Sequence, residues 1–159
     1  MIPLTVAQTE MGLVEGWWGE EVEEVFAASG TRVDDMIGKM IEIPRAAIVA
    51  DEIAETAEFF SFGTNDLTQT TYGLSRDDAG RFLPGYVERG IFPDDPFQVL
   101  DQSGVGQLIK LAVAAGRGVR PPLKVGICGE HGGEPSARKF GTAIGADEVR
   151  LPSERRPTA

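Results

Sequence analysis

Residues 36–66 read MIGKMIEIPRAAIVADEIAETAEFFSFGTND, and this stretch decides the fold class. Residues 36–43 form an apolar run typical of a buried strand, which Pro44 closes. Pro44 also suits the first turn of a helix. We expect the inner face of that helix to carry four apolar residues, Ile48, Ile53, Ala54 and Ala57. Residues 58–63 contain the run FFSF, so the stretch predicts a strand, a helix and a second strand.

The same alternation continues along the rest of the chain. The predicted strands cover residues 1–4, 36–43, 58–63, 124–128 and 148–151. The other predicted helices are one with Trp18, Val22, Val25 and Phe26 at helical spacing that stops at Gly30, one over 97–115 and one over 136–144. The polar segment over residues 75–96 is too long for an ordinary connection, so we expect it to be functional or to carry small helices of its own.

Strands that alternate with helices predict an α/β fold with right-handed crossovers and a parallel sheet. Two architectures fit this pattern, a doubly wound open sheet and part of an eight-stranded barrel. A complete barrel takes about 250 residues. Five strands in 159 residues would therefore make a little over half of one.

Composition excludes several classes of protein. The net charge of −10, from 25 acidic and 15 basic side chains, has the wrong sign for nonspecific nucleic-acid binding. No run of 18 apolar residues is present, so we expect no membrane span. The single cysteine, Cys128, excludes a disulfide framework and suits a reducing cytoplasm. We expect Trp17 and Trp18 to serve helix packing.

Polar residues follow three of the predicted strands at the point where each ends. Glu42 ends one strand, Asn65 and Asp66 follow the next, and Cys128 ends another. In parallel α/β folds the carboxyl ends of the strands carry the chemistry. Glu42 and Asp66 could share one Mg²⁺, although either acid alone could equally be a rim residue or a helix cap.

Cys128 and the only histidine, His131, lie three residues apart beside a run of glycines. Cys128 could be a small buried apolar residue, or an acid that donates a proton to an enolate. His131 could tune that thiol or simply fill the loop. The glycine-bearing turns at residues 63–65 and 129–133 could present backbone N–H groups to a phosphate or carboxylate.

Residues 37–57 and 59–69 resemble the carboxyl-terminal barrel of the phosphoenolpyruvate-utilising enzymes. Two further stretches, YGLSRDDAGRFL at 72–83 and GICGEHGGEP at 126–135, resemble the pyruvate, phosphate dikinase branch of that family. The resemblance extends over about residues 1–145. It implies a partial (β/α)8 TIM-type barrel, about strands 4 to 8, over residues 1–152, followed by a short disordered tail over 153–159.

The resemblance also implies a reaction, in which a phosphoryl group passes between a phosphohistidine on another domain and pyruvate enolate. The implied Mg²⁺ ligands are Glu42 and Asp66, and Cys128 is the implied catalytic residue for the methyl proton. The implied contacts to pyruvate or phosphoenolpyruvate are Glu42, Ser61, Gly63, Thr64, Asn65 and Asp66.

Departures from the family pattern keep two alternatives open. Lys39 stands where the family usually has a small hydroxyl residue, and the arginines of the earlier barrel strands and the phosphohistidine domain are absent from these 159 residues. One alternative is an Mg²⁺-dependent barrel lyase or aldolase that forms pyruvate enolate, and the other is a non-catalytic truncated fragment. The open edges of a half barrel also predict a homodimer or other self-association.

Overall fold

One parallel sheet organises the chain in the computed structural model, which describes residues 1–149. Its strands are β1 (Gly38–Ile41), β2 (Phe59–Gly63), β3 (Lys124–Cys128) and β4 (Glu148–Val149). Each strand pairs in parallel with the next, in the order β1-β2-β3-β4. The predicted α/β class is therefore confirmed. The order never reverses among these four strands, as in a partial barrel and unlike a doubly wound sheet.

The N-terminal strand expected over residues 1–4 does not form as predicted. Only Ile2 joins the sheet, through an isolated parallel bridge in which its N–H donates to Gly38 O at 2.8 Å and its carbonyl accepts from Met40 N at 2.9 Å. Leu4, with φ 51, turns the chain away from the sheet. At the other end, the last part of the strand predicted over 148–151, and the predicted tail, lie outside the described residues.

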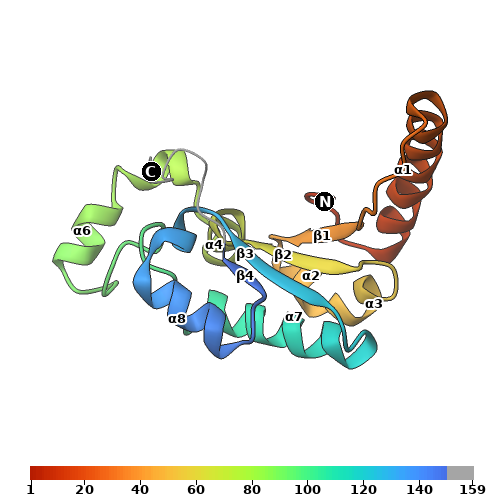
Figure 1. Cartoon of the computed structure of the whole chain (residues 1–159). Helices are drawn as coiled ribbons and strands as arrows, with labels where there is room; N and C mark the ends of the chain where they lie inside the picture. Colours follow the sequence, from red (N-terminus) through yellow and green to blue (C-terminus); the bar gives the residue numbers. More distant parts are fainter. Residues whose placement is uncertain (150–159) are drawn as a thin grey trace, which may run out of the picture.

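The first helix, α1 (Gln8–Ser29), ends at Gly30 in the left-handed conformation, as the sequence predicts. Its packing was predicted wrongly, because Trp17 and Trp18 are 63% and 50% exposed and Met11 is its one fully buried residue. Figure 1 shows why: α1 extends away from the sheet, beyond the core. The Trp18 indole N–H instead donates to the Asp35 carboxylate at 3.1 Å. No helix within residues 1–149 is long and apolar enough to cross a membrane.

The helix predicted after Pro44 is broken into α2 (Pro44–Ile48) and α3 (Ala50–Ala54). The break lies at Val49, whose ψ of 31 is not helical. Ile53 and the alanines that follow it are buried, as predicted. Ile48 is 61% exposed, contrary to the prediction, because the buried residues Ala46, Ala47, Ala50 and Ile53 recur at helical spacing and Ile48 lies opposite that stripe.

The remaining helices connect and cover the strands. The polar segment over residues 75–96 carries two small helices of its own, as expected. The remaining helices are α4 (Thr64–Tyr72), α5 (Arg76–Ala79), α6 (Leu83–Glu88), α7 (Val105–Val119), the 3-10 turn η1 (Glu130–Gly133) and α8 (Pro135–Ala143), of which α5 and α6 lie in the 75–96 segment. Helix α7 begins eight residues later than predicted, because the Asp101 carboxylate accepts backbone N–H groups there, from Ser103, Gly104 and Val105.

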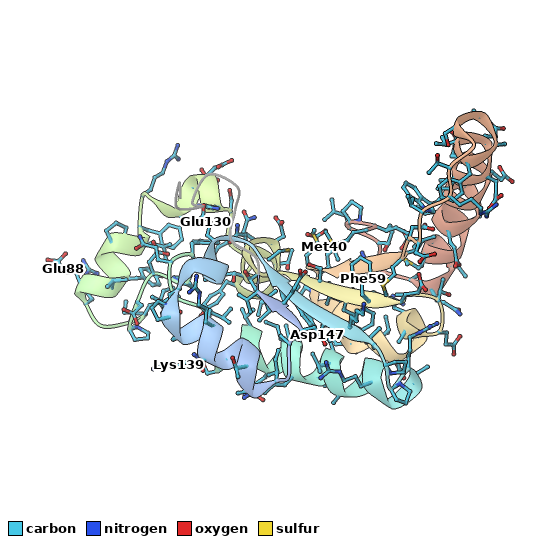
Figure 2. The ribbon with its side chains drawn as sticks, in the orientation of Figure 1. Met40, Phe59, Glu88, Glu130, Lys139 and Asp147 are labelled. Atoms are coloured by element: carbon cyan, nitrogen blue, oxygen red, sulfur yellow. The ribbon has the colours of Figure 1, made fainter. Side chains whose placement is uncertain are left out.

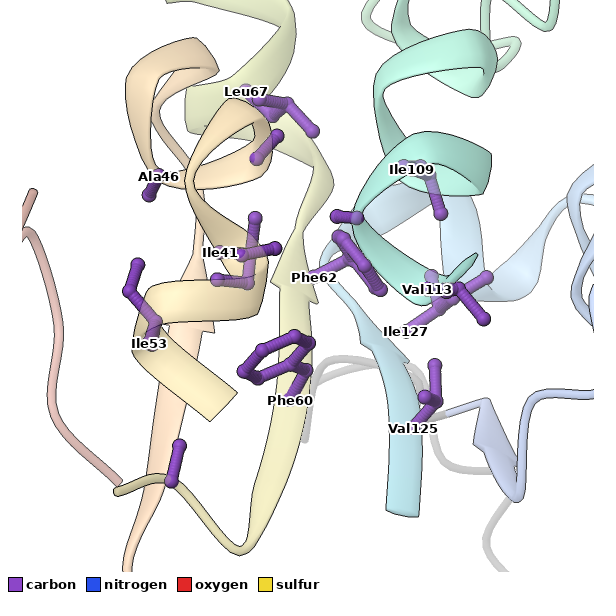
Figure 3. Close-up of a cluster of buried hydrophobic side chains, with 14 of the residues drawn as sticks. Ile41, Ala46, Ile53, Phe60, Phe62, Leu67, Ile109, Val113, Val125 and Ile127 are labelled. Atoms are coloured by element: carbon purple, nitrogen blue, oxygen red, sulfur yellow. The ribbon is translucent and has the colours of Figure 1, made fainter. Parts of the chain in front are cut away.

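The two faces of the sheet differ. Figure 1 shows α2, α3 and α7 covering one face, and Figure 3 shows the apolar side chains that fill this layer. Phe60, Phe62 and Ile127 point into it and are fully buried. Within the described part of the chain no helix covers the opposite face, where Ser61 and Cys128 help to line a hollow of about 510 Å³.

Candidate functional site

Strand register places the predicted site residues along one edge of the sheet. Ile41 pairs with Phe62, so Glu42, the next residue, is level with Gly63. Gly63 in turn pairs with Cys128. The three residues therefore stand in a row across the carboxyl ends of β1, β2 and β3. Figure 2 labels Glu130 at the same end, just after β3.

Glu42 is an acid held inside the protein. It is 3% exposed, and one of its oxygens accepts the Leu4 N–H at 2.8 Å. A Cβ on Gly63 would lie 2.6 Å from the other oxygen, so the absence of a side chain at Gly63 makes room for the carboxylate. Burial, with the nearby Asp66 carboxylate as a further cause, raises the pKa of Glu42 above its usual value. A bound cation would relieve both effects.

Asp66 supplies the second carboxylate, at the start of α4. It is not the N-cap of that helix, which is Gly63, and it accepts a hydrogen bond from the Gln69 amide at 3.1 Å. Mg²⁺ is commonly held by one or two carboxylates, with water and substrate oxygens completing the octahedron. Residues 1–149 contain no group of three acidic, cysteine or histidine side chains suited to a metal. Glu42 and Asp66 thus fit an ion that takes its other ligands from outside the described residues.

The start of α4 contributes polar groups of a different kind. Thr64 and Asn65 form its first turn, where backbone N–H groups lack helical partners and attract anions. The Asn65 side-chain oxygen is buried and has no hydrogen-bond partner within the described residues. Ser61, 9% exposed, lies two residues before Gly63 on the uncovered face. These groups could orient a small carboxylate beside the two acids.

Cys128 lies at the end of β3 and is half-buried. Its sulfur lies 3.4 Å from the Phe62 carbonyl oxygen, to which the thiol can donate. The side chain lines the hollow on the uncovered face together with Ser61. Gly129, with φ 106, then turns the chain sharply into η1. The thiol is therefore placed beside the candidate anion-binding turn and outside the apolar core.

The site also includes a residue outside the strand ends, because His131 connects Thr64 to the 75–96 segment. The imidazole is fully buried, with Nδ1 2.9 Å from Thr64 Oγ1 and Nε2 2.9 Å from Pro96 O. Arg76 and Glu130 form an ion pair at 2.5 Å between the same two regions. Sequence spacing carries no signal for these contacts, which join residues 35 to 67 positions apart.

Lys39, the departure from the family pattern, lies on the covered side of the sheet. It is fully buried, and its ammonium donates to Ile2 O at 3.5 Å. Burial lowers the pKa of Lys39 to about 8, against the opposing influence of the Glu42 and Glu10 carboxylates. Lys39 thus adds a buried basic group three residues before the acid that ends β1.

A family model described as "PEP-utilising enzyme, PEP-binding domain" matches residues 1–158. The chain belongs to this family. This agrees with the resemblance inferred from the motifs.

Relatives of the PEP-binding domain with similar sequences are pyruvate, phosphate dikinases. The chloroplastic enzyme of Mesembryanthemum crystallinum is 57% identical over 159 residues, which is all of this chain and 17% of that protein. Pyruvate, phosphate dikinase 2 of Zea mays is 56% identical, and the enzyme of Clostridium symbiosum is 54% identical, each with 18% of its length covered. The chain thus spans less than a fifth of these relatives. Since some of them are named as chloroplastic, the cytoplasmic location stays a prediction.

Proposed function

We propose that this chain is part of a pyruvate, phosphate dikinase and carries part of the site for pyruvate and phosphoenolpyruvate. The observation that supports this most strongly is the row of Glu42, Gly63 and Cys128 at the strand ends in a chain whose relatives bear that name. The sheet would be a segment of a (β/α)8 barrel, in keeping with its sequential parallel order.

The two carboxylates, Glu42 and Asp66, would hold Mg²⁺. When bound, the ion would supply positive charge that stabilises the enolate form of pyruvate. The buried position of Glu42 would keep its carboxylate fixed, with the Leu4 N–H holding one oxygen in place.

The first turn of α4 would bind the carboxylate of the substrate through its backbone N–H groups. The Asn65 amide N–H and the Ser61 hydroxyl would donate to the same ligand, whereas the buried Asn65 oxygen, which lacks a partner within residues 1–149, can only accept. Cys128 would remove or donate the proton of the methyl carbon from the adjoining strand end. The phosphoryl group would come from a phosphohistidine domain, and its transfer would depend on positioning and charge neutralisation.

Calorimetric titration with oxalate, a mimic of the enolate, tests the proposed site directly. We expect oxalate to bind only when Mg²⁺ is present, and Glu42→Gln to abolish that binding. Glu52→Gln, at an exposed acid on α3, is the matched control and should bind oxalate as the unmodified chain does. Oxalate binding that is unaffected by Glu42→Gln would overturn the metal assignment.

Activity assays separate the alternatives. Exchange of the pyruvate methyl protons that requires Cys128, tested with Cys128→Ala, would support the proposed proton transfer. Cleavage of a 2-keto acid without phosphoenolpyruvate would favour an Mg²⁺-dependent lyase or aldolase. Absence of both oxalate binding and methyl-proton exchange in the unmodified chain would mean that the chain alone is non-catalytic.

We also propose that the chain associates with itself through open sheet edges. Beside β1, within residues 1–149, the sheet continues only as the single bridge to Ile2, and an incompletely paired edge tends to recruit another strand. Sedimentation velocity over a range of concentrations should show dimers or larger species. A stable monomer at all concentrations would contradict this.

A further inference from the structure

His131, the only histidine in the chain, has a hydrogen-bond arrangement that defines its tautomer. The Pro96 carbonyl oxygen, 2.9 Å from Nε2, can only accept. Nε2 must therefore carry a proton. The ring is fully buried, which disfavours the charged imidazolium and lowers the pKa of His131.

Three charged side chains act on the ring as well. Glu130 and Glu134 favour its protonated form, whereas Arg76 opposes it. Burial outweighs the Pro96 hydrogen bond and the two acids, all of which favour protonation, so the neutral ring predominates near pH 7. In the neutral ring with a proton on Nε2, Nδ1 is a hydrogen-bond acceptor.

The Thr64 hydroxyl faces this acceptor. Its oxygen lies 2.9 Å from Nδ1 of His131 and 3.0 Å from the carbonyl oxygen of Cys128. Thr64 is fully buried, so water cannot replace either partner. The hydroxyl has one proton, which the neutral His131 ring and the Cys128 carbonyl both compete to accept.

The same hydroxyl also packs against the turn that follows Cys128. A Cβ placed on Gly129 would lie 2.9 Å from Thr64 Oγ1, so the turn fits closely over the threonine. The contacts therefore connect Pro96, His131, Thr64 and the Cys128–Gly129 turn in one continuous chain. That chain joins the 75–96 segment to the ends of β2 and β3.

We propose that neutral His131 is a positioning residue, which competes with the Cys128 carbonyl for the Thr64 hydroxyl proton and so sets how firmly that hydroxyl holds the turn that carries Cys128. The inference rests on the proposed function only in giving Cys128 a role in the chemistry. The coupling itself is a property of the protein without metal or substrate. It also gives the 75–96 segment a purpose, since Pro96 holds the ring in the required tautomer.

Nitrogen-15 NMR of the single imidazole tests the tautomer without ambiguity. We expect the pattern of a neutral ring protonated at Nε2, with Nδ1 unprotonated, at pH 7. A ring protonated at Nδ1, or a fully protonated ring, would overturn the proposal.

Alkylation of the single thiol by iodoacetamide, at fixed pH, tests the coupling. His131→Gln keeps an N–H for Pro96 but removes the Nδ1 acceptor, and Thr64→Val removes the hydroxyl at similar volume. Removing the Nδ1 acceptor leaves the hydroxyl proton to the Cys128 carbonyl, so His131→Gln should tighten the turn and slow alkylation about threefold. Thr64→Val removes the hydroxyl, so it should loosen the turn and speed alkylation about threefold, the effect of losing one ordinary hydrogen bond. Because His131 acts only through this hydroxyl, the double variant should be about threefold faster, like Thr64→Val alone, rather than close to the unmodified rate expected of independent and opposite effects.

Thr64→Ser, which keeps the hydroxyl, should alkylate at the rate of the unmodified chain. Urea unfolding of each variant identifies any that fails to fold, and if Thr64→Val does, the same cycle is run with Thr64→Ala. An unchanged rate in His131→Gln, or independent effects in the double variant, would overturn the proposal. The alkylation assay uses neither Mg²⁺ nor oxalate, so it tests the coupling separately from the proposed function. The coupling can be refuted while Mg²⁺-dependent oxalate binding is observed, and oxalate binding can be absent while the coupling is observed.

Discussion

Gly63→Ala is a small change that tests whether the close contact between β2 and Glu42 matters. The added Cβ would lie 2.6 Å from a Glu42 carboxylate oxygen, 3.0 Å from Glu42 Cβ and 3.2 Å from Met40 Sδ. The φ of Gly63 is −78, which alanine adopts without strain. Any cost must therefore come from crowding alone, and the carboxylate has to move.

The size of the effect follows from the contacts that the movement disturbs. Displacing the carboxylate weakens its charge-assisted hydrogen bond to the Leu4 N–H, a bond worth about 1.5–3 kcal/mol. Overpacking of a filled site costs about 1–3 kcal/mol. The lower entropy of the unfolded alanine chain returns about 0.4–1 kcal/mol. We expect the free energy of unfolding to fall by about 2 kcal/mol, with partial relaxation taken into account.

Urea unfolding followed by circular dichroism measures the change, and Gly126→Ala is its matched control. Gly126 lies on the neighbouring strand, and the nearest atoms to a Cβ there are 3.8 Å away, an ordinary contact. The control should be neutral or slightly stabilising, and it should keep Mg²⁺-dependent oxalate binding, which Gly63→Ala should lose. Equal stability and equal binding in the two variants would refute the argument from crowding.

Three further predictions follow from packing and charge. Gly116→Ala should lower the free energy of unfolding by about 1–2 kcal/mol despite the better helix propensity of alanine, because the added Cβ would lie 2.6 Å from the Phe60 ring. Gly118→Ala, on the same helix, adds a Cβ that meets no atom within 4 Å, so it should stabilise the chain by up to about 1 kcal/mol. Denaturant midpoints that rank the two variants in the other order would contradict this. Trp17→Ala should leave the free energy of unfolding in urea within about 0.5 kcal/mol of that of the unmodified chain, since the ring is 63% exposed, and a loss as large as that of a core residue would disprove the exposed position of α1. Burial of Lys39 lowers its pKa from 10.5 to about 8, so between pH 8 and 10.5 the unfolded chain binds more protons than the folded chain and the free energy of unfolding should rise with pH. Lys39→Met should raise the free energy of unfolding at pH 7 by up to about 3 kcal/mol and should abolish its increase with pH, as urea titrations at pH 7 and 10 would show.

The sequence predicted the sheet and the row of strand-end residues because both depend on local patterns. A buried strand needs a short apolar run, and a parallel sheet needs helices between such runs. The strand over Lys124–Cys128 was predicted to the residue, and Glu42 and Cys128 were placed at one edge by the alternation alone. The assignment of these residues to metal, substrate and proton transfer stays a prediction.

The sequence could not predict features that depend on contacts between distant segments. Apolar spacing identified α1 as a helix, but what the helix packs against is not encoded in its own periodicity, and Trp17 proved exposed. The break at Val49 likewise has no proline or glycine to signal it. The exposure of Ile48 is different, because the helical spacing of the buried alanines already places it on the outer face.

By itself, then, the sequence determined the α/β class, the parallel direction of the strands and which polar residues end them, since these follow from hydrophobic runs and chain direction. Only the tertiary structure decided the environment of each polar group. It buried Glu42 beneath the Leu4 N–H, and it enclosed His131 between Thr64 and Pro96. The physical reason is that burial and hydrogen-bond partners are properties of segments brought together by folding, and those properties determine charge, tautomer and reactivity.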